Sequence, residues 1–230
     1  MDFVDLLFAF ARSLLFAMAG VLPIINPVAS APVFVSLTRA LDEPTREQLA
    51  RRVGKNVALL LAAAMVLGSF VLDLFGISLP VVRVAGGVIV AYNAWLLLNA
   101  QPPGEDDKAQ MAQTFSAANV ERNSFYPMTF PLTCGPGALA AAIAVGASLK
   151  TRQVTLAVAN LAGGLVAMLL IGVLIALLFR YAPRLVRRLG EVGQIVFLRI
   201  MSFMVLCVGV QIIWEGVRAL LISVLPAPAA

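Results

Sequence analysis

Long apolar stretches alternate with short polar ones along most of this chain of 230 residues. An α-helix needs about 20 consecutive, predominantly apolar residues to cross a bilayer. Six stretches reach that length, and they are residues 8–38, 53–75, 79–99, 122–148, 153–179 and 195–223. The pattern predicts an all-α polytopic membrane protein with six transmembrane helices.

The longest polar segment, residues 101–121, divides these spans into two groups of three. It opens with Pro102-Pro103-Gly104 followed by Glu105-Asp106-Asp107-Lys108, which is typical of an aqueous linker. It predicts a first three-helix repeat over residues 1–100 and a second over residues 122–230. We expect both repeats to pack together as one integral membrane domain, with the linker in the cytoplasm.

The two repeats resemble each other when the first is shifted by 104 positions. The shift places Asn56 on Asn160 and Gly68 on Gly172, and it superposes two triplets of prolines. These triplets are Pro23, Pro27, Pro32 and Pro127, Pro131, Pro136. Because each repeat has an odd number of spans, the second copy must insert upside down. The sequence therefore predicts two inverted repeats, each with a proline-broken first helix.

The prolines predict breaks in the helices, because an interior proline costs about 3 kcal/mol and leaves a carbonyl without its partner. Inside a membrane such backbone persists where it lines a cavity or is buried in protein. Small and polar residues lie beside the prolines: Asn26, Ser30, Ala31, Thr129, Thr133, Cys134, Gly135 and Gly137. We expect these residues to bind a small substrate near the midplane. The N-termini of the new half-helices would attract its carboxylate, and the freed carbonyls its ammonium group.

Each of these features also has a simpler interpretation. Prolines commonly only kink membrane helices, although two matched triplets favour breaks. Asn56 and Asn160 serve equally well as substrate contacts or as hydrogen-bonding groups between helices. Arg83 and Arg199 occupy opposite mouths of the predicted bundle, where they form gate contacts or extend to the lipid headgroups.

The composition excludes several other classes of protein. The chain is 61% hydrophobic and only 13% charged, far from the roughly 25% charged residues of soluble domains. It has no histidine, and its two cysteines, Cys134 and Cys207, lie apart in apolar spans. We therefore predict no metal site, no cofactor and no enzymatic activity. The net charge of +5 does not indicate nucleic-acid binding, because the basic residues flank the apolar spans.

The distribution of basic residues predicts the orientation in the membrane. The regions after the first, third and fifth spans contain ten: Arg39, Arg46, Arg51, Arg52, Lys55, Lys108, Arg122, Arg184, Arg187 and Arg188. The opposite side holds Lys150, Arg152 and Arg218. The positive-inside rule places the first set in the cytoplasm and both termini outside it.

Three passages resemble the MarC family of bacterial and archaeal inner-membrane proteins. They are Asn26-Pro27-Val28-Ala29-Ser30-Ala31-Pro32-Val33-Phe34, Leu79-Pro80-Val81-Val82-Arg83-Val84-Ala85-Gly86-Gly87 and Pro131-Leu132-Thr133-Cys134-Gly135-Pro136-Gly137. The resemblance covers nearly the whole chain and implies six spans in the inner membrane. It also implies transport of small neutral amino acids such as glycine and alanine, and a relationship to exporters of the LysE type.

The leading hypothesis is a secondary transporter of small neutral amino acids that works by alternating access. A passive channel, or a carrier of another small solute or drug-like compound, remains as the alternative. A membrane enzyme is least favoured, because Ser30 stands where a thiol-electron carrier would need a second cysteine, 104 positions before Cys134. The expected partners are the substrate, the lipid bilayer and a coupling ion, either sodium or a proton. The sequence leaves the oligomeric state open.

Overall fold

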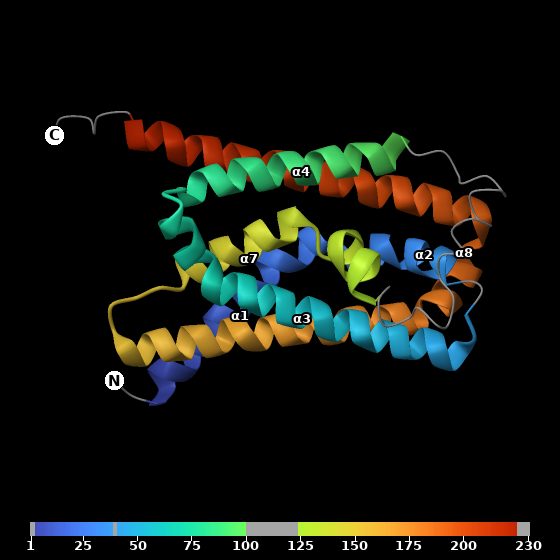
Figure 1. Cartoon of the computed structure of the whole chain (residues 1–230), viewed down its shortest axis with the longest axis horizontal. Coiled ribbons are helices and arrows are strands. Elements are labelled where there is room, and N and C mark those ends of the chain that lie inside the picture. Colours follow the sequence, from blue (N-terminus) through green and yellow to red (C-terminus); the bar gives the residue numbers. More distant parts are fainter. Residues whose placement is uncertain (1–2, 39–40, 100–123, 225–230) are drawn as a thin grey trace.

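The computed structural model describes residues 3–38, 41–99 and 124–224, and within these ranges it contains helices and no strand. The all-α prediction is therefore confirmed. The elements are α1 (Phe3–Ile25), α2 (Pro27–Leu37), α3 (Glu43–Leu74), α4 (Leu79–Asn99), η2 (Ser124–Thr133), α7 (Pro136–Ser148) and α8 (Val154–Val224). Most of them run along the long axis of the molecule (Figure 1). The predicted linker 101–121 lies outside the described residues.

Several of these helices are long and apolar enough to cross a membrane. In the described part of the chain the spans are Val4–Ile25, Leu79–Leu96, Val154–Val186 and Ile195–Ser223. Segments η2 and α7 are together apolar enough for one further span, but they bend by 73° between them, as in a broken span or a re-entrant loop. The chain is thus a polytopic membrane protein, while the count of six spans and the inverted repeats stay predictions.

Two predicted loops are in fact helical. Helix α3 already begins at Glu43, so Arg46, Arg51 and Lys55 lie on its first turns and not in a loop. Helix α8 likewise continues past residue 179 and changes direction only at Gly190, whose φ of 65° a residue without a Cβ adopts easily. The physical reason is that charged residues such as Arg and Lys favour helix, so the helices extend beyond the apolar core.

The packing is crosswise between the two halves of the chain. From the first half, α3 lies against the part of α8 before Gly190, where Gly54 meets Gly172, and against α7, where Met65 meets Gly146. From the second half, α8 covers α2, and the Phe34 and Phe179 rings stack with their centroids 4.4 Å apart. A single buried apolar cluster runs through these contacts.

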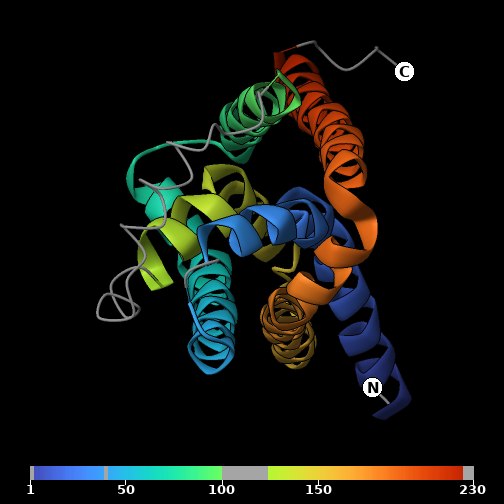
Figure 2. The ribbon, with the colours of Figure 1, turned by 90° about the vertical axis from the view of Figure 1, so that its right-hand side faces the viewer.

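Helix α4 and the part of α8 that follows Gly190 lie to one side of this core. These two helices, which we call the α4–α8 pair, pack along each other (Figures 1 and 2). A Cβ at Gly209 would lie 2.7 Å from the Ala91 amide nitrogen, and one at Gly216 would lie 2.8 Å from the Pro80 carbonyl oxygen. The two helices therefore touch through their backbones, as small residues allow in membranes.

The two ends of the molecule differ in charge. Helix α1 begins and α8 ends at one end, whereas the α2–α3 connection and the Gly190 bend lie at the other (Figure 1). The first turns of α3 and the turns of α8 before Gly190 carry the basic residues of this second end, including Arg51 and Arg184. Lys150 and Arg152 belong to the α7–α8 connection at the first end. Many of the described basic residues therefore gather at the second end, whereas Arg39, Lys108 and Arg122 lie outside the described residues.

Candidate functional site

The first break in a membrane helix occurs at one residue, Asn26. Its φ of 44° is left-handed, which ends α1 at Ile25 and lets α2 begin at Pro27. The Ser30 hydroxyl then donates to the Pro27 carbonyl oxygen at 3.1 Å. Pro23 and Pro32 lie inside α1 and α2, so only the central proline of this triplet marks the break.

The second break is longer and is built from a short direct repeat. The sequence Tyr126-Pro127-Met128-Thr129 is followed at once by Phe130-Pro131-Leu132-Thr133. In each unit the aromatic residue is extended, with φ/ψ of −117°/125° at Tyr126 and −123°/126° at Phe130. The peptide bond between each aromatic residue and its proline is cis.

The threonine that closes each unit donates a hydrogen bond to the backbone five residues earlier. Thr129 Oγ1 donates to the Ser124 carbonyl oxygen and Thr133 Oγ1 to the Met128 carbonyl oxygen, both at 2.7 Å. Both threonines are buried. Their hydroxyls supply donors in a segment where two prolines remove backbone N–H groups. The repeat of an aromatic residue, proline, an apolar residue and threonine is a sequence signal for this arrangement that the proline spacing alone does not contain.

After this segment a new helix, α7, also begins at a proline. The Cys134 amide donates to the Thr129 carbonyl oxygen at 2.7 Å, Gly135 is extended, and Pro136 is the first residue of α7. The pair Gly135-Pro136 thus plays the part of Asn26-Pro27. The two triplets of prolines are therefore not equivalent in structure, because Pro27 and Pro136 start the half-helices although they are not matched by the 104-residue shift.

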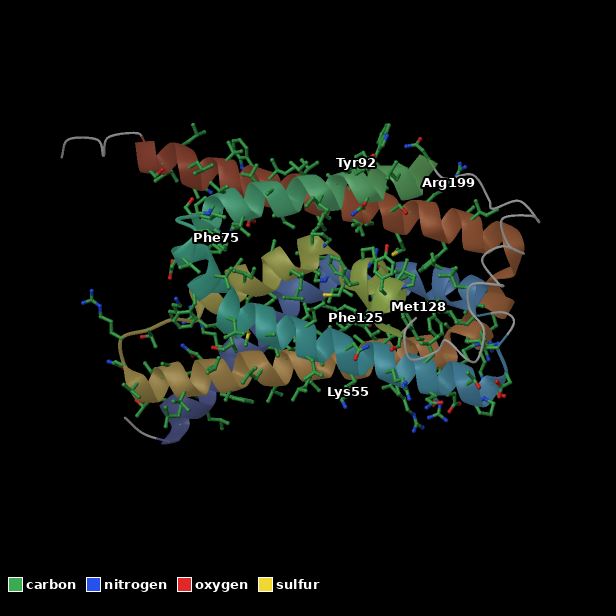
Figure 3. The ribbon with its side chains drawn as sticks, in the orientation of Figure 1. Lys55, Phe75, Tyr92, Phe125, Met128 and Arg199 are labelled. Atoms are coloured by element: carbon green, nitrogen blue, oxygen red, sulfur yellow. The ribbon has the colours of Figure 1, made fainter. Side chains whose placement is uncertain are left out.

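Both breaks lie in the same buried cluster. Ile25 and Ala31 flank the first break, Cys134 and Ala138 flank the second, and all four are at most 6% exposed. Helix α2 touches η2 directly, and Met128 of η2 is completely buried among these helices (Figure 3). The predicted residues Asn26, Ser30, Ala31, Thr129, Thr133, Cys134, Gly135 and Gly137 therefore surround the two breaks.

Each break also contacts one helix of the α4–α8 pair. The Asn26 side-chain Nδ2 donates to the Met201 carbonyl oxygen on α8 at 3.5 Å. Gly137, in the first turn of α7, packs tightly on Val90 of α4, and Gly86 of α4 packs on Ala140. The breaks are thus the places where the core of the molecule meets the α4–α8 pair.

Asn160, one of the two asparagines that the 104-residue shift pairs, makes its hydrogen bonds away from the breaks. Asn160 accepts a hydrogen bond from Ser13 Oγ at 2.9 Å and donates to the Leu149 carbonyl oxygen at 3.3 Å. It therefore joins α1, the end of α7 and α8, which is the simpler of the two roles considered. Asn56 is half-buried on α3.

The two predicted gate arginines lie toward opposite ends of the α4–α8 pair. Arg83 is half-buried near the start of α4, close in sequence to Val84, which packs on Gly216. Arg199 is exposed and lies toward the end at which α8 bends (Figure 3). Their role as gate contacts stays a prediction.

The breaks contain oxygen and amide groups, and the hydroxyls of Ser30, Thr129 and Thr133 donate to main-chain carbonyls. Within the described ranges, no three His, Cys, Asp or Glu side chains gather closely enough to hold a metal ion. The groups at the breaks are hydroxyls, one side-chain amide and main-chain carbonyls. Such groups are suited to hydrogen-bonded substrates and, among cations, to those that prefer oxygen ligands.

Comparison with known proteins identifies the family. The model of the MarC family integral membrane proteins matches residues 11–221. The membrane protein YhcE of Escherichia coli (strain K12) is 31% identical over 201 residues, which cover 87% of this chain and 90% of that protein. The inner membrane protein MarC of the same strain is 29% identical over 206 residues, covering 85% and 90%.

A membrane protein of Buchnera aphidicola is 28% identical over 205 residues, covering 85% of this chain and 88% of that protein. No solved structure matches the chain. The matched region includes both broken helices and the α4–α8 pair, and the chain therefore belongs to the MarC family of integral membrane proteins.

Proposed function

We propose that this protein is a secondary transporter of small neutral amino acids, of the size of glycine or alanine, that works by alternating access. The observation that carries the proposal is that two proline-led half-helices, α2 and α7, both contribute to one buried cluster. In transporters, half-helix ends and unwound backbone of this kind form the substrate site near the midplane.

The chemistry of the breaks supports an amino acid as the substrate. Each half-helix begins with a proline, Pro27 or Pro136, and its first amides carry the positive end of the helix dipole. These ends would bind a carboxylate. The carbonyl oxygens before the breaks and the Asn26 side chain would accept hydrogen bonds from the ammonium group and so orient it. The close packing of Gly137 on Val90 favours a substrate with a small side chain.

The arrangement of helices supports alternating access. The core touches the α4–α8 pair largely through small residues such as Gly86, Gly137 and Ala140, and through the Asn26–Met201 hydrogen bond. Smooth contacts of this kind allow one group of helices to shift against another. The crosswise packing of the two halves is what inverted repeats would produce, and repeats of this type exchange their roles when access alternates.

We further propose a bacterial inner-membrane location with both termini outside the cytoplasm. Relatives of this chain are named inner membrane proteins, and the basic end of the molecule belongs in the cytoplasm by the positive-inside rule. A reporter enzyme active only in the cytoplasm, fused after the C-terminus, should stay inactive. Activity of this fusion would reverse the orientation.

Transport by the purified protein in proteoliposomes tests the main proposal. Labelled glycine and alanine should enter in a saturable manner, each competing with the other. Uptake should increase under either a sodium or a proton gradient, which identifies the coupling ion. The matched control is Leu177→Ala, which changes an exposed apolar position of α8 and should transport normally. Absence of uptake and binding under all gradients would overturn the substrate assignment.

A passive channel is the competing function. Counterflow separates the two, because a carrier loaded inside with unlabelled alanine accelerates the entry of labelled alanine and a channel does not. A drug-like substrate is distinguished by competition, since it would displace bound alanine only if both share the site at the breaks.

A further inference from the structure

A polar group faces outward in the middle of a membrane span on α8. Gln211 is exposed and lies near the centre of the apolar segment Ile195–Ser223. The packing of α8 on α4 indicates the same depth in the membrane for this part of α8. Gly209 packs on Ala91 and Gly87, which lie near the middle of the α4 span Leu79–Leu96. Gln211 therefore lies at the level of the lipid acyl chains, where no water is present to bind its amide.

The side chain lies on the face of α8 that points away from α4. Successive residues of an α-helix are rotated by about 100°, so Gln211 is about 160° away from Gly209, which contacts α4. Gln211 Nε2 donates to Glu215 Oε1 at 3.2 Å, one turn further along. The Gln211 amide oxygen receives no hydrogen bond from any residue that the structure describes. Buried polar groups in membranes normally bind a neighbouring helix.

A shallow groove marks the same face. Its volume is about 510 Å³, and its described lining comes from α8 alone: Leu206, Cys207, Val210, Gln211 and Trp214. One row of exposed residues in the middle of this face has spacings of four and three, which is the spacing of a helix–helix seam, and other exposed residues such as Phe203 and Val210 lie beside it. The residues of the row are Ile200, Met204, Cys207, Gln211, Trp214 and Arg218. Figure 2 shows this part of α8 at the edge of the molecule.

We propose that this row of residues, the α8 seam, is the interface with a second copy of the same chain. Two copies inserted in one orientation place their α8 helices parallel about a two-fold axis, so each seam residue meets its own counterpart. An amide suits this position, because it both donates and accepts and so pairs with itself. Lipid acyl chains offer no such partner to the amide.

The two cysteines of the chain provide a direct test. Cys207 lies on the α8 seam and is exposed, whereas Cys134 is buried at the second break. Oxidation with copper phenanthroline in membranes and proteoliposomes should link two chains through Cys207. The linked dimer should persist in Cys134→Ser, disappear in Cys207→Ser and resist dilution with lipid. Light scattering in nanodiscs should give the mass of two chains.

The central amide is tested by Gln211→Leu, which is more apolar and should insert normally. This substitution should lower the association constant of the two chains about fivefold, since hydrogen bonds between membrane helices contribute on the order of 1 kcal/mol. The control for random collision is Val173→Cys in the Cys207→Ser background, at another exposed position of α8. Its links should vanish on dilution.

Three results would overturn the proposal. They are a single-chain or three-chain mass in nanodiscs, a dimer that never links through Cys207, and Cys207 links that fade on dilution as those of the Val173→Cys control do. The second result would mean that another protein surface forms the dimer. None of these results bears on transport, so the two proposals stand or fall separately.

Discussion

Gly54 of α3 and Gly172 of α8 lie face to face where these helices cross, so that a Cβ on either residue would collide with the carbonyl oxygen of the other. Four residues further on, Ala58 and Ala176 extend the same contact: Ala176 faces Gly54, and Ala58 faces Gly172. The two helices thus present matching small-residue pairs, which let membrane helices approach until their backbones touch.

The first prediction concerns this crossing. Gly54→Ala should lower the free energy of unfolding by about 1–3 kcal/mol, because the added methyl group must push two packed helices apart. Titration of the purified protein with sodium dodecyl sulfate, followed by circular dichroism, measures the change. Leu59→Ala, at an exposed position of the same helix, is the control and should have a smaller effect. Equal stability of Gly54→Ala and the parent would mean that the crossing is looser than described.

The second prediction separates the backbone of the first break from its side chain. Asn26 has a φ of 44°, a conformation that Asn and Gly tolerate and that costs Ala about 1–2 kcal/mol. Asn26→Ala should therefore lose stability, and Asn26→Gly should keep most of it. Both lose the amide that donates to the Met201 carbonyl.

Uptake of labelled alanine then reports on the amide alone. If that amide helps to bind substrate or to hold α8 during transport, uptake should fall several-fold in both variants. Full uptake by Asn26→Gly would remove the side chain from the mechanism and leave only the bend.

The third prediction concerns the hydrogen bond between α1 and α8. Ser13 Oγ and Asn160 Oδ1 are 2.9 Å apart in a half-buried position. A double-mutant cycle of Ser13→Ala and Asn160→Ala should give a coupling energy of about 0.6 kcal/mol, the average for such bonds in membranes. Neither variant should change substrate affinity, because Asn160 contacts Ser13 and Leu149 and not the breaks. A large loss of substrate affinity in Asn160→Ala alone would mean that Asn160 belongs to the substrate site.

The sequence predicts the parts of this fold that depend on local pattern. Apolar length gives several of the spans, although the predicted span 53–75, within α3, is not among the candidates that the structure yields. Gly76, with a φ of 65°, forms the turn between α3 and α4. Local pattern does not say which proline breaks a helix. Pro23 and Pro32 stay within helices while the break falls on Asn26, because that outcome depends on contacts with other helices, such as the bond to Met201.

The sequence predicts which residues lie at the breaks of the candidate site, but not which other helices surround them. The residues beside the prolines do surround the breaks, since chain proximity alone keeps them near. Asn160 was paired with Asn56 by sequence alignment, yet its surroundings come from α1 and α7, which only the tertiary packing brings there. Helix α3 also begins earlier, and α8 continues further, than apolar length predicts, because apolar length marks the membrane core and not the end of the helix.

The last prediction uses the direct repeat in the second break. Thr133→Val keeps the shape of the side chain and removes the hydroxyl that donates to the Met128 carbonyl at 2.7 Å. The carbonyl is then left without this donor in a buried place, which should cost about 1–3 kcal/mol of stability. Thr133→Ser keeps the hydroxyl and should restore most of it. Thr129→Val removes the equivalent bond to Ser124 and should cost a similar amount.

Substrate affinity should separate the two threonines. Thr133 directly precedes Cys134 and Gly135, which lead into α7, so its loss disturbs the half-helix end proposed to hold the carboxylate. Thr129 lies one repeat unit earlier, and although its carbonyl oxygen accepts the Cys134 amide, the hydroxyl that Thr129→Val removes bonds back to Ser124. Binding of alanine should therefore weaken more in Thr133→Val than in Thr129→Val, by isothermal titration of the purified proteins. Equal affinities in both variants would assign the repeat to the architecture of the break and move the carboxylate to the start of α2.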